Sequence, residues 1–139
     1  MIPRDRYLNK LISKKENGMI KVITGIRRCG KSYLLFEIYH QYLNSIGVPD
    51  DHIIELTLDD DLNARYRNPL ELGTYVRSLV SADAGSMYYV FLDEIQKVVT
   101  IDNPYVPGGM DQIGFVDVLL GLMKLKADVS VAGVVQSVR

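Results

Sequence analysis

The sequence predicts an α/β protein, a three-layer αβα sandwich in which helices cover both faces of a parallel sheet. Three observations lead to this prediction. Short apolar segments alternate with segments of helical periodicity, the pattern of parallel strands joined by crossover helices. Residues 87–92, MYYVFL, are apolar at every position, as strands covered on both faces are. A glycine-containing segment, residues 25–32, lies between the first strand-like segment and the first long helix.

The first half of the chain is predicted to begin with a short amphipathic helix over residues 4–13. The β-branched segment 19–24 is the first strand, and a helix beginning at Ser32 ends at Gly47, a residue typical of helix C-caps. Residues 52–58, HIIELTL, form the second strand. The side chains expected to face the core from the two helices are Tyr7, Leu8, Leu11, Ile12, Leu34, Leu35, Ile38, Tyr42 and Leu43.

The second half continues the alternation after a polar loop that opens at Asp59. Asn68 and Pro69 are an N-cap and a proline at the first helical position, so a helix should run from there to about Val80. Its expected buried side chains are Leu70, Leu72, Tyr75, Val76 and Leu79. The remaining elements are a strand at 87–92, a long loop at 100–114, a helix at 115–126 and a fourth strand at 128–135.

Length and composition indicate one globular domain, residues 1–139. The chain is 47% hydrophobic and 24% charged, and its net charge of -1 provides no general attraction to nucleic acid or membranes. No apolar run reaches membrane-spanning length, and the N-terminus lacks the apolar core of a secretory signal. A single cysteine cannot form an internal disulfide, which favours a cytoplasmic protein without a membrane partner.

Residues 25–32 read GIRRCGKS and match the phosphate-binding pattern G-x-x-x-x-G-K-[ST]. The glycines and the start of the following helix present backbone N–H groups to phosphate oxygens. Lys31 should reach the β- and γ-phosphates, and the Ser32 hydroxyl should bind Mg²⁺. The residues expected to line the nucleotide are Gly25, Ile26, Arg27, Arg28, Cys29, Gly30, Lys31, Ser32 and Tyr33.

The alternative interpretation of GIRRCGKS is a basic turn between a strand and a helix that binds no ligand. The strand–loop–helix context favours the P-loop. Cys29 is either a reactive thiol or, as we favour, a small residue at an unconstrained loop position. Arg27 and Arg28 are either solvent-exposed or contacts to phosphate or to a neighbouring subunit. The absence of an N-K-x-D signature argues against a GTPase.

The strand at 87–92 is followed directly by Asp93 and Glu94, the Walker B pattern. An aspartate at the carboxyl edge of the sheet would bind the Mg²⁺ that Ser32 shares. Glu94 would then activate the attacking water, acting with Lys31 as a catalytic residue. The alternative for Glu94 is a carboxylate that caps a helix or lies in a loop.

Together, GIRRCGKSYLL, FLDEIQ and the N-terminal R-x-x-Y-L-x-x-L resemble the AAA-type P-loop ATPases of prokaryotes that often carry a C-terminal domain of unknown function. The resemblance covers nearly the whole chain. It implies the additional-strand class of P-loop NTPases, with the fourth strand between the P-loop strand and the strand that carries Asp93. It also implies ATP and Mg²⁺ as ligands. Gln96 belongs to the family motif, with no role assigned.

The chain departs from that family at its end. Members usually place a polar sensor residue just after the fourth strand, whereas Ala132-Gly133-Val134 offers no hydroxyl, so Gln136 or Ser137 would have to substitute. We therefore expect a fragment of a larger protein, cut after the fourth strand and lacking a second domain. Such a fragment would bind ATP and hydrolyse it inefficiently, whereas the intact parent would be an ATPase.

Other candidate sites receive weaker support. The acids at 59–61 are expected to form a solvated turn rather than a metal cluster. Neither His40 nor His52 has partners at zinc-ligand spacing. The long loop at 100–114 is either a partner-binding segment or a mobile insertion. The tyrosines interpreted as packing residues rather than a base-stacking platform are Tyr33, Tyr39 and Tyr42.

These motifs support two functions. The first is a molecular switch or motor driven by ATP hydrolysis. The second is an interaction module that binds ATP without appreciable hydrolysis and meets a partner through the loop at 100–114. A small-molecule phosphotransferase is disfavoured, because Glu94 would activate competing water. The sequence leaves open the work that ATP drives, a homo-oligomeric state and the identity of any protein or nucleic-acid partner.

Overall fold

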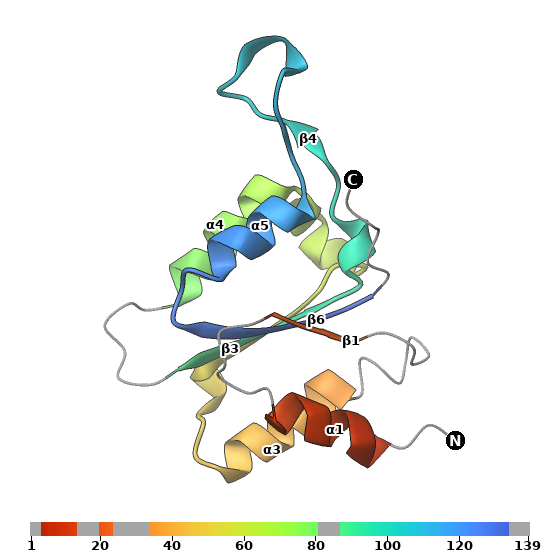
Figure 1. Ribbon diagram of the computed structural model, residues 1–139, viewed down its shortest axis with the longest axis vertical. Coiled ribbons are helices and arrows are strands. Elements are labelled where there is room, and N and C mark those ends of the chain that lie inside the picture. Colours follow the sequence, from red (N-terminus) through yellow and green to blue (C-terminus); the bar gives the residue numbers. More distant parts are fainter. Residues whose placement is uncertain (1–3, 14–19, 24–33, 81–86, 134–139) are drawn as a thin grey trace.

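The structure is a computed structural model that describes residues 4–13, 20–23, 34–80 and 87–133, drawn as ribbons in Figure 1. Four strands form one parallel sheet in the order β1-β6-β3-β2. The strands are β1 (Lys21–Ile23), β2 (Ile53–Thr57), β3 (Tyr88–Asp93) and β6 (Ala127–Ala132).

The order of the strands confirms the predicted fold class. β6, the last of the four strands of this sheet along the chain, lies between β1 and β3, which is the arrangement that the family resemblance implied. All six residues of β3 are buried, as expected of a strand covered on both faces. Because the strands are parallel, the carboxyl ends of β2 and β3 meet at one edge, with Thr57 beside Asp93.

Helices α4 (Pro69–Leu79) and α5 (Phe115–Leu122) pack together on one face of the sheet (Figure 1). Asn68 caps α4 as predicted, because its Oδ1 accepts from the N–H groups of Leu70 and Glu71. The buried residues of this layer are Ile54, Leu56, Leu58, Leu72, Val76, Val80, Tyr88, Val90, Leu92, Ile95, Val118, Leu122, Val129 and Val131.

Two predicted core residues of α4 are exposed. Leu70 lies on the side of the helix opposite Leu72, and Leu79 is the last helical residue. Of the five residues predicted to be buried in α4, Leu72 and Val76 are fully buried. Tyr75 is half-buried, and its ring lies against that of Tyr66 at a centroid distance of 4.4 Å. Helix α5 also ends earlier than predicted, at Leu122 rather than Lys126.

The other face of the sheet is covered by α1 (Arg4–Ser13), whose bounds match the prediction, and by a helix in two parts (Figure 1). The first part, η1 (Leu34–Tyr39), is π-helical, and the second, α3 (His40–Ser45), is α-helical. Gly47 follows with a φ of +100°, a left-handed conformation that favours glycine at a helix end. The buried residues of this layer are Leu11, Leu34, Leu35, Tyr39, Leu43, Ile53, Tyr89, Phe91 and Ala132.

The π-helical turns change which side chains this helix buries. Tyr39 is fully buried and stacks on Phe91 with ring centroids 5.4 Å apart, whereas the predicted core residues Ile38 and Tyr42 are half-buried. A π-helix has a longer hydrogen-bonded repeat than an α-helix, so a stripe drawn at the α-helical period drifts off the core. The interpretation of Tyr39 as a packing residue is confirmed.

A buried ion pair connects β1 to β6 on the face covered by α1. Lys21 Nζ lies 2.6 Å from Asp128 Oδ1, and both side chains are almost completely buried. Asp128 lies on this face because it is four residues before Ala132 in the same strand, and Ala132 belongs to the layer covered by α1. The edge strand β1 is therefore attached to the sheet by a charge contact as well as by its backbone.

The segment predicted as a long loop at 100–114 forms a hairpin of two short antiparallel strands, β4 (Ile101–Asp102) and β5 (Gln112–Ile113). It extends away from the helices and the sheet (Figure 1). Short 3-10 turns make up the other local structure: Asp50–His52, Asp61–Arg67, Ile95–Lys97 and Pro107–Gly109.

Candidate functional site

The predicted phosphate-binding segment, residues 25–32, lies outside the described residues, as does Tyr33. The structure describes its two flanks: β1, which ends at Ile23, and the helix that begins at Leu34. The roles assigned to Gly25, Lys31 and the residues between and beside them therefore stay predictions. The described part of the site is the carboxyl edge of β2, β3 and β6.

Asp93 ends β3 and is only 2% exposed. Its Oδ1 accepts a hydrogen bond from the backbone N–H of Glu94 at 2.9 Å, and its carbonyl oxygen accepts one from Leu58 at 3.0 Å. Because side chains alternate along a strand, Asp93 lies on the same face as Phe91, which packs against the helix that follows residues 25–33. The carboxylate is thus on the side of the sheet where that helix begins.

Glu94 follows Asp93 and is 4% exposed. Its backbone has φ 57° and ψ 49°, and it is the single non-glycine residue with positive φ in the described part of the chain. Left-handed backbone costs free energy for a residue with a Cβ, as does burial of a carboxylate. Gln96 meets this carboxylate, with its Nε2 donating to Glu94 Oε1 at 2.5 Å.

The donor set at this edge fits a magnesium ion that is shared with phosphate. Asp93 offers a hard carboxylate oxygen, and Mg²⁺ in nucleotide sites is usually held by one or two carboxylates together with substrate phosphates and water. In the ranges that the structure covers, no group of three or more His, Cys, Asp or Glu side chains could hold a metal ion. A cation at Asp93 would therefore need ligands from the nucleotide and from the segment that contains Ser32.

The last residue of β2, Thr57, and Asp59 in the loop after it are two polar residues that sequence reasoning did not assign to the site. Thr57 pairs with Asp93 across the strands, and its Oγ1 donates to Asp59 Oδ1 at 2.7 Å. The acids at 59–61 form no cluster: Asp60 caps the turn that follows by accepting from the N–H of Leu62, and Asp61 is exposed. The pairing of Thr57 with Asp93 could have been found by aligning the ends of the two strands.

The position after β6, where the family resemblance implied a polar sensor, is occupied by Gly133. Its φ is +133°, and a Cβ built there would lie 2.5 Å from Gln96 Oε1 and 2.8 Å from the backbone nitrogen of Ile95. A side chain therefore has no room at this position. The substitutes named from the sequence, Gln136 and Ser137, lie outside the described residues.

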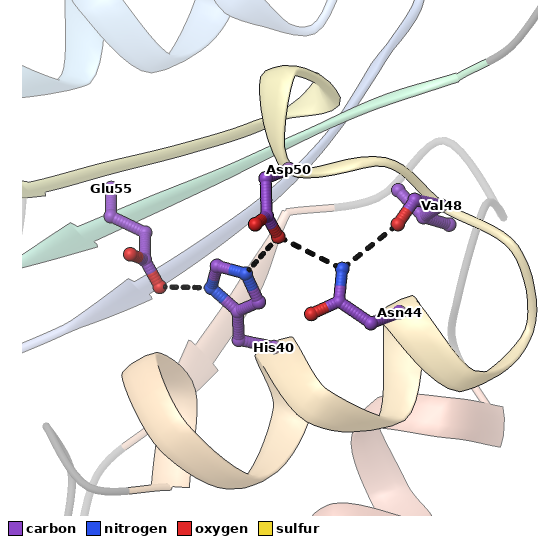
Figure 2. Close-up of polar contacts among 5 residues, drawn as sticks. All are labelled: His40, Asn44, Val48, Asp50 and Glu55. Atoms are coloured by element: carbon purple, nitrogen blue, oxygen red, sulfur yellow. Dashed lines mark hydrogen bonds and ion pairs between the residues drawn. The ribbon is translucent and has the colours of Figure 1, made fainter.

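The two histidines contact other side chains. The ring of His40 lies between Asp50 and Glu55, with Nε2 and Nδ1 each 2.8 Å from a carboxylate oxygen (Figure 2). Asn44 also donates to Asp50 Oδ1, at 3.0 Å. The ring of His52 stacks on Tyr88 at 4.0 Å.

Comparison with known proteins identifies the family. The family model described as "AAA domain" matches residues 17–113, more than half of the chain. The chain belongs to the AAA domain family. As a member, it is an ATPase-like nucleotide-binding domain. The matched range contains the predicted phosphate-binding segment, Asp93, Glu94 and the β4–β5 hairpin.

This AAA domain is also similar to an uncharacterized protein of Haemophilus influenzae, with 33% identity over 98 residues. The match covers 70% of this chain and 24% of that protein, so the shared region spans about a quarter of the relative. No solved structure matched the chain. Within the described part of this AAA domain, every helix is too short or too polar to span a bilayer.

Proposed function

We propose that this AAA domain binds Mg·ATP and hydrolyses it to drive a conformational task in a larger protein. Backbone N–H groups of residues 25–32 would hold the phosphates, and Lys31 would contact the β- and γ-phosphates. Glu94 would orient a water molecule and polarise it for attack on the γ-phosphorus. The bond from that phosphorus to the bridging oxygen breaks, and ADP and phosphate leave.

Asp93 and the Ser32 hydroxyl would hold the Mg²⁺, which neutralises phosphate charge when bound. The chain's own contribution is to fix where Asp93 and Glu94 lie. Adjacent residues at the end of a strand point in different directions, so one carboxylate can serve the metal while the other meets the water. The buried backbone contacts of Asp93 keep it at the edge of the sheet.

One observation carries this proposal: two consecutive carboxylates are buried at the carboxyl edge of a parallel sheet, the second of them on left-handed backbone. Burial of two acids and strained backbone each lower stability, so stability alone gives no reason to keep them. Open α/β sheets bind their ligands at this edge. The family match supports a nucleotide as the ligand.

Glu94→Gln and Lys31→Ala test the proposal when compared with the wild-type chain. Titration calorimetry with ATP and Mg²⁺ measures binding, and phosphate release measures turnover. We expect Glu94→Gln to bind like the wild type and to lose turnover by roughly 100- to 10,000-fold. Lys31→Ala should weaken ATP binding by about 10- to 100-fold, because it removes a charged contact to phosphate.

Lys124→Ala is the matched control, since Lys124 is exposed between α5 and β6. It should bind and turn over ATP like the wild type. Turnover that survives in Glu94→Gln would remove the assigned base. ATP affinity that is unchanged in Lys31→Ala would contradict the phosphate cradle.

A second candidate function is a nucleotide-dependent interaction module that binds ATP without appreciable hydrolysis. The β4–β5 hairpin favours it, because the hairpin projects from the molecule and exposes Tyr105 by 87% and Met110 by 82%. Large exposed apolar side chains often mark interaction sites. Saturable ATP binding that is lost in Lys31→Ala, with no phosphate release from the wild type, would favour this function over hydrolysis.

A further inference from the structure

Gln96 lies in the turn Ile95–Lys97, two residues after Glu94. Its Nε2 donates to Glu94 Oε1 over 2.5 Å. An ionised carboxylate can only accept hydrogen bonds, so the NH₂ end of the Gln96 amide must face Glu94. The oxygen end of the amide then points away from Glu94.

The oxygen end of the amide faces Gly133. Any residue other than glycine at position 133 would place its Cβ 2.5 Å from Gln96 Oε1, which is closer than real Cβ contacts. The φ of Gly133, +133°, also favours glycine. Gly133 is buried and directly follows β6. The Gln96 residue as a whole is exposed, but its amide lies between the Glu94 carboxylate and the carboxyl end of β6.

β6 is the strand beside β1, and β1 leads into residues 25–32. If a change at the phosphate-binding segment shifted the carboxyl end of β6, the Gln96 amide would move with it, and the hydrogen-bonded Glu94 carboxylate would move as well. A side chain at position 133 would displace the Gln96 amide, and the connection between Glu94 and β6 would be lost.

We propose that Gln96 is a positioning residue, which fixes the orientation of the Glu94 carboxylate and couples it to the carboxyl end of β6. This inference rests on the role of Glu94 in the proposed function. It assigns a role to the glutamine of the DEIQ segment. It also explains why the position after β6 is glycine: this position seats Gln96 instead of presenting a polar side chain of its own.

The contact can be tested without nucleotide. In ¹⁵N-labelled chain, the side-chain amide signals of Gln96 should differ between the wild type and Glu94→Gln, because the charged acceptor of its hydrogen bond is lost. Gln112 is the matched control, because its Nε2 donates to Asp102 Oδ1 at 3.1 Å in the hairpin. The Gln112 signals should be the same in both proteins. If the side-chain amide signals of Gln96 are unchanged in Glu94→Gln, the proposal is overturned, whether or not the chain turns ATP over.

The functional consequence is tested with Gln96→Ala. We expect kcat to fall by about 10- to 100-fold, since a hydrogen bond to a charged group is lost. ATP affinity should stay within about twofold of the wild type, since Gln96 lies outside the predicted phosphate-binding segment. Gln112→Ala removes the same kind of bond and should change none of these.

Gly133→Ala provides a second variant. In chain that remains folded, it should displace Gln96 and lower kcat as Gln96→Ala does, with ATP affinity unchanged. The outcomes separate the two proposals. If Glu94→Gln keeps its turnover, the proposed function fails. If Glu94→Gln loses turnover while Gln96→Ala matches the wild type in kcat, the positioning role alone fails.

Discussion

Protonation of His40 is favoured because its ring lies between two carboxylates. Each ring nitrogen faces a carboxylate oxygen, Nε2 toward Asp50 and Nδ1 toward Glu55 (Figure 2). A neutral imidazole has one N–H, so both contacts are favourable only when the ring is protonated. Desolvation lowers the pKa of His40, but the hydrogen bonds and charges of Asp50 and Glu55 together outweigh it and raise the pKa above 6.5. The same contact with His40, aided by Asn44, lowers the pKa of Asp50.

These shifts predict how stability depends on pH. A raised folded-state pKa at His40 contributes stability that is fully present below its unfolded value of 6.5 and lost as pH rises through the folded pKa. The lowered pKa of Asp50 contributes stability that is present above 3.8 and lost as pH falls through the folded pKa. Both contributions are complete between about pH 4 and 6.5.

Urea unfolding of the wild type and of His40→Gln at pH 5.5 and pH 8.5 checks this. The wild type should be the more stable protein at pH 5.5, and the difference should shrink at pH 8.5. His52→Gln is the control, since the His52 ring stacks on Tyr88 and its Nδ1 lies 3.3 Å from the Met87 carbonyl oxygen. A difference between wild type and His40→Gln that is equal at both pH values would contradict a charged His40.

At the scale of elements, β1 is a three-residue edge strand that pairs with β6 alone among the described strands. So short a ladder holds a strand weakly, and the buried contact of Lys21 with Asp128 adds an ionic attachment. This attachment fixes the position of β1, whose last residue, Ile23, is two positions before the predicted phosphate-binding segment in the sequence.

Removal of one ion from this pair should be costly. Lys21→Met removes the cation that lies 2.6 Å from the completely buried Asp128 carboxylate, which should lower the free energy of unfolding by about 3–5 kcal/mol. Lys126→Met is the matched control, because Lys126 is exposed just before β6. Urea denaturation measures both. The double variant Lys21→Met with Asp128→Leu should recover most of the loss, and a loss below about 1 kcal/mol in Lys21→Met would mean that the pair does not hold β1.

At the scale of the whole molecule, the β4–β5 hairpin stands apart from the two buried layers (Figure 1). Its fold is held locally: Asn103 donates to the Asp111 carboxylate at 2.9 Å, and the backbones of the two residues are joined at 2.8 Å. Residues 98–123 contain three aspartates and no Lys, Arg or His, a charge pattern that disfavours nucleic acid. Residues 1–31 of the sequence carry nine Lys and Arg, one of which, Lys21, is buried, so a second copy supplies charge of the opposite sign.

The double variant Tyr105→Ser with Met110→Ser tests whether copies associate through the hairpin. We expect wild-type chain to self-associate with Mg·ATP in sedimentation velocity and the variant to sediment as a smaller species. The free energy of unfolding should change by no more than about 0.5 kcal/mol, because both side chains are exposed. Val116→Ser, another exposed apolar residue but on α5, is the control. Equal sedimentation of variant and wild type would exclude a contact between copies at the hairpin tip.

The fold class, most of the helices and strands, and the motifs could be predicted from the sequence alone. Local signals define helix α1, the Asn68 cap and the apolar strand β3, because capping and hydrophobic periodicity act over a few residues. The same range of interaction explains why Asp93 and Glu94 could be picked out: they directly follow a fully apolar strand. The roles of residues 25–32 depend on sequence alone, since they lie outside the described residues.

Only the tertiary structure decided which residues far apart in the chain meet. The contact of Gln96 with Gly133, the pair of Lys21 with Asp128 and the two carboxylates around His40 all join different elements, and no local pattern encodes them. The π-helical turns that bury Tyr39, and the hairpin in place of a loop, likewise depend on packing and pairing beyond the local window. Local propensity selects an element, whereas burial and strand register decide which of its side chains reach a partner.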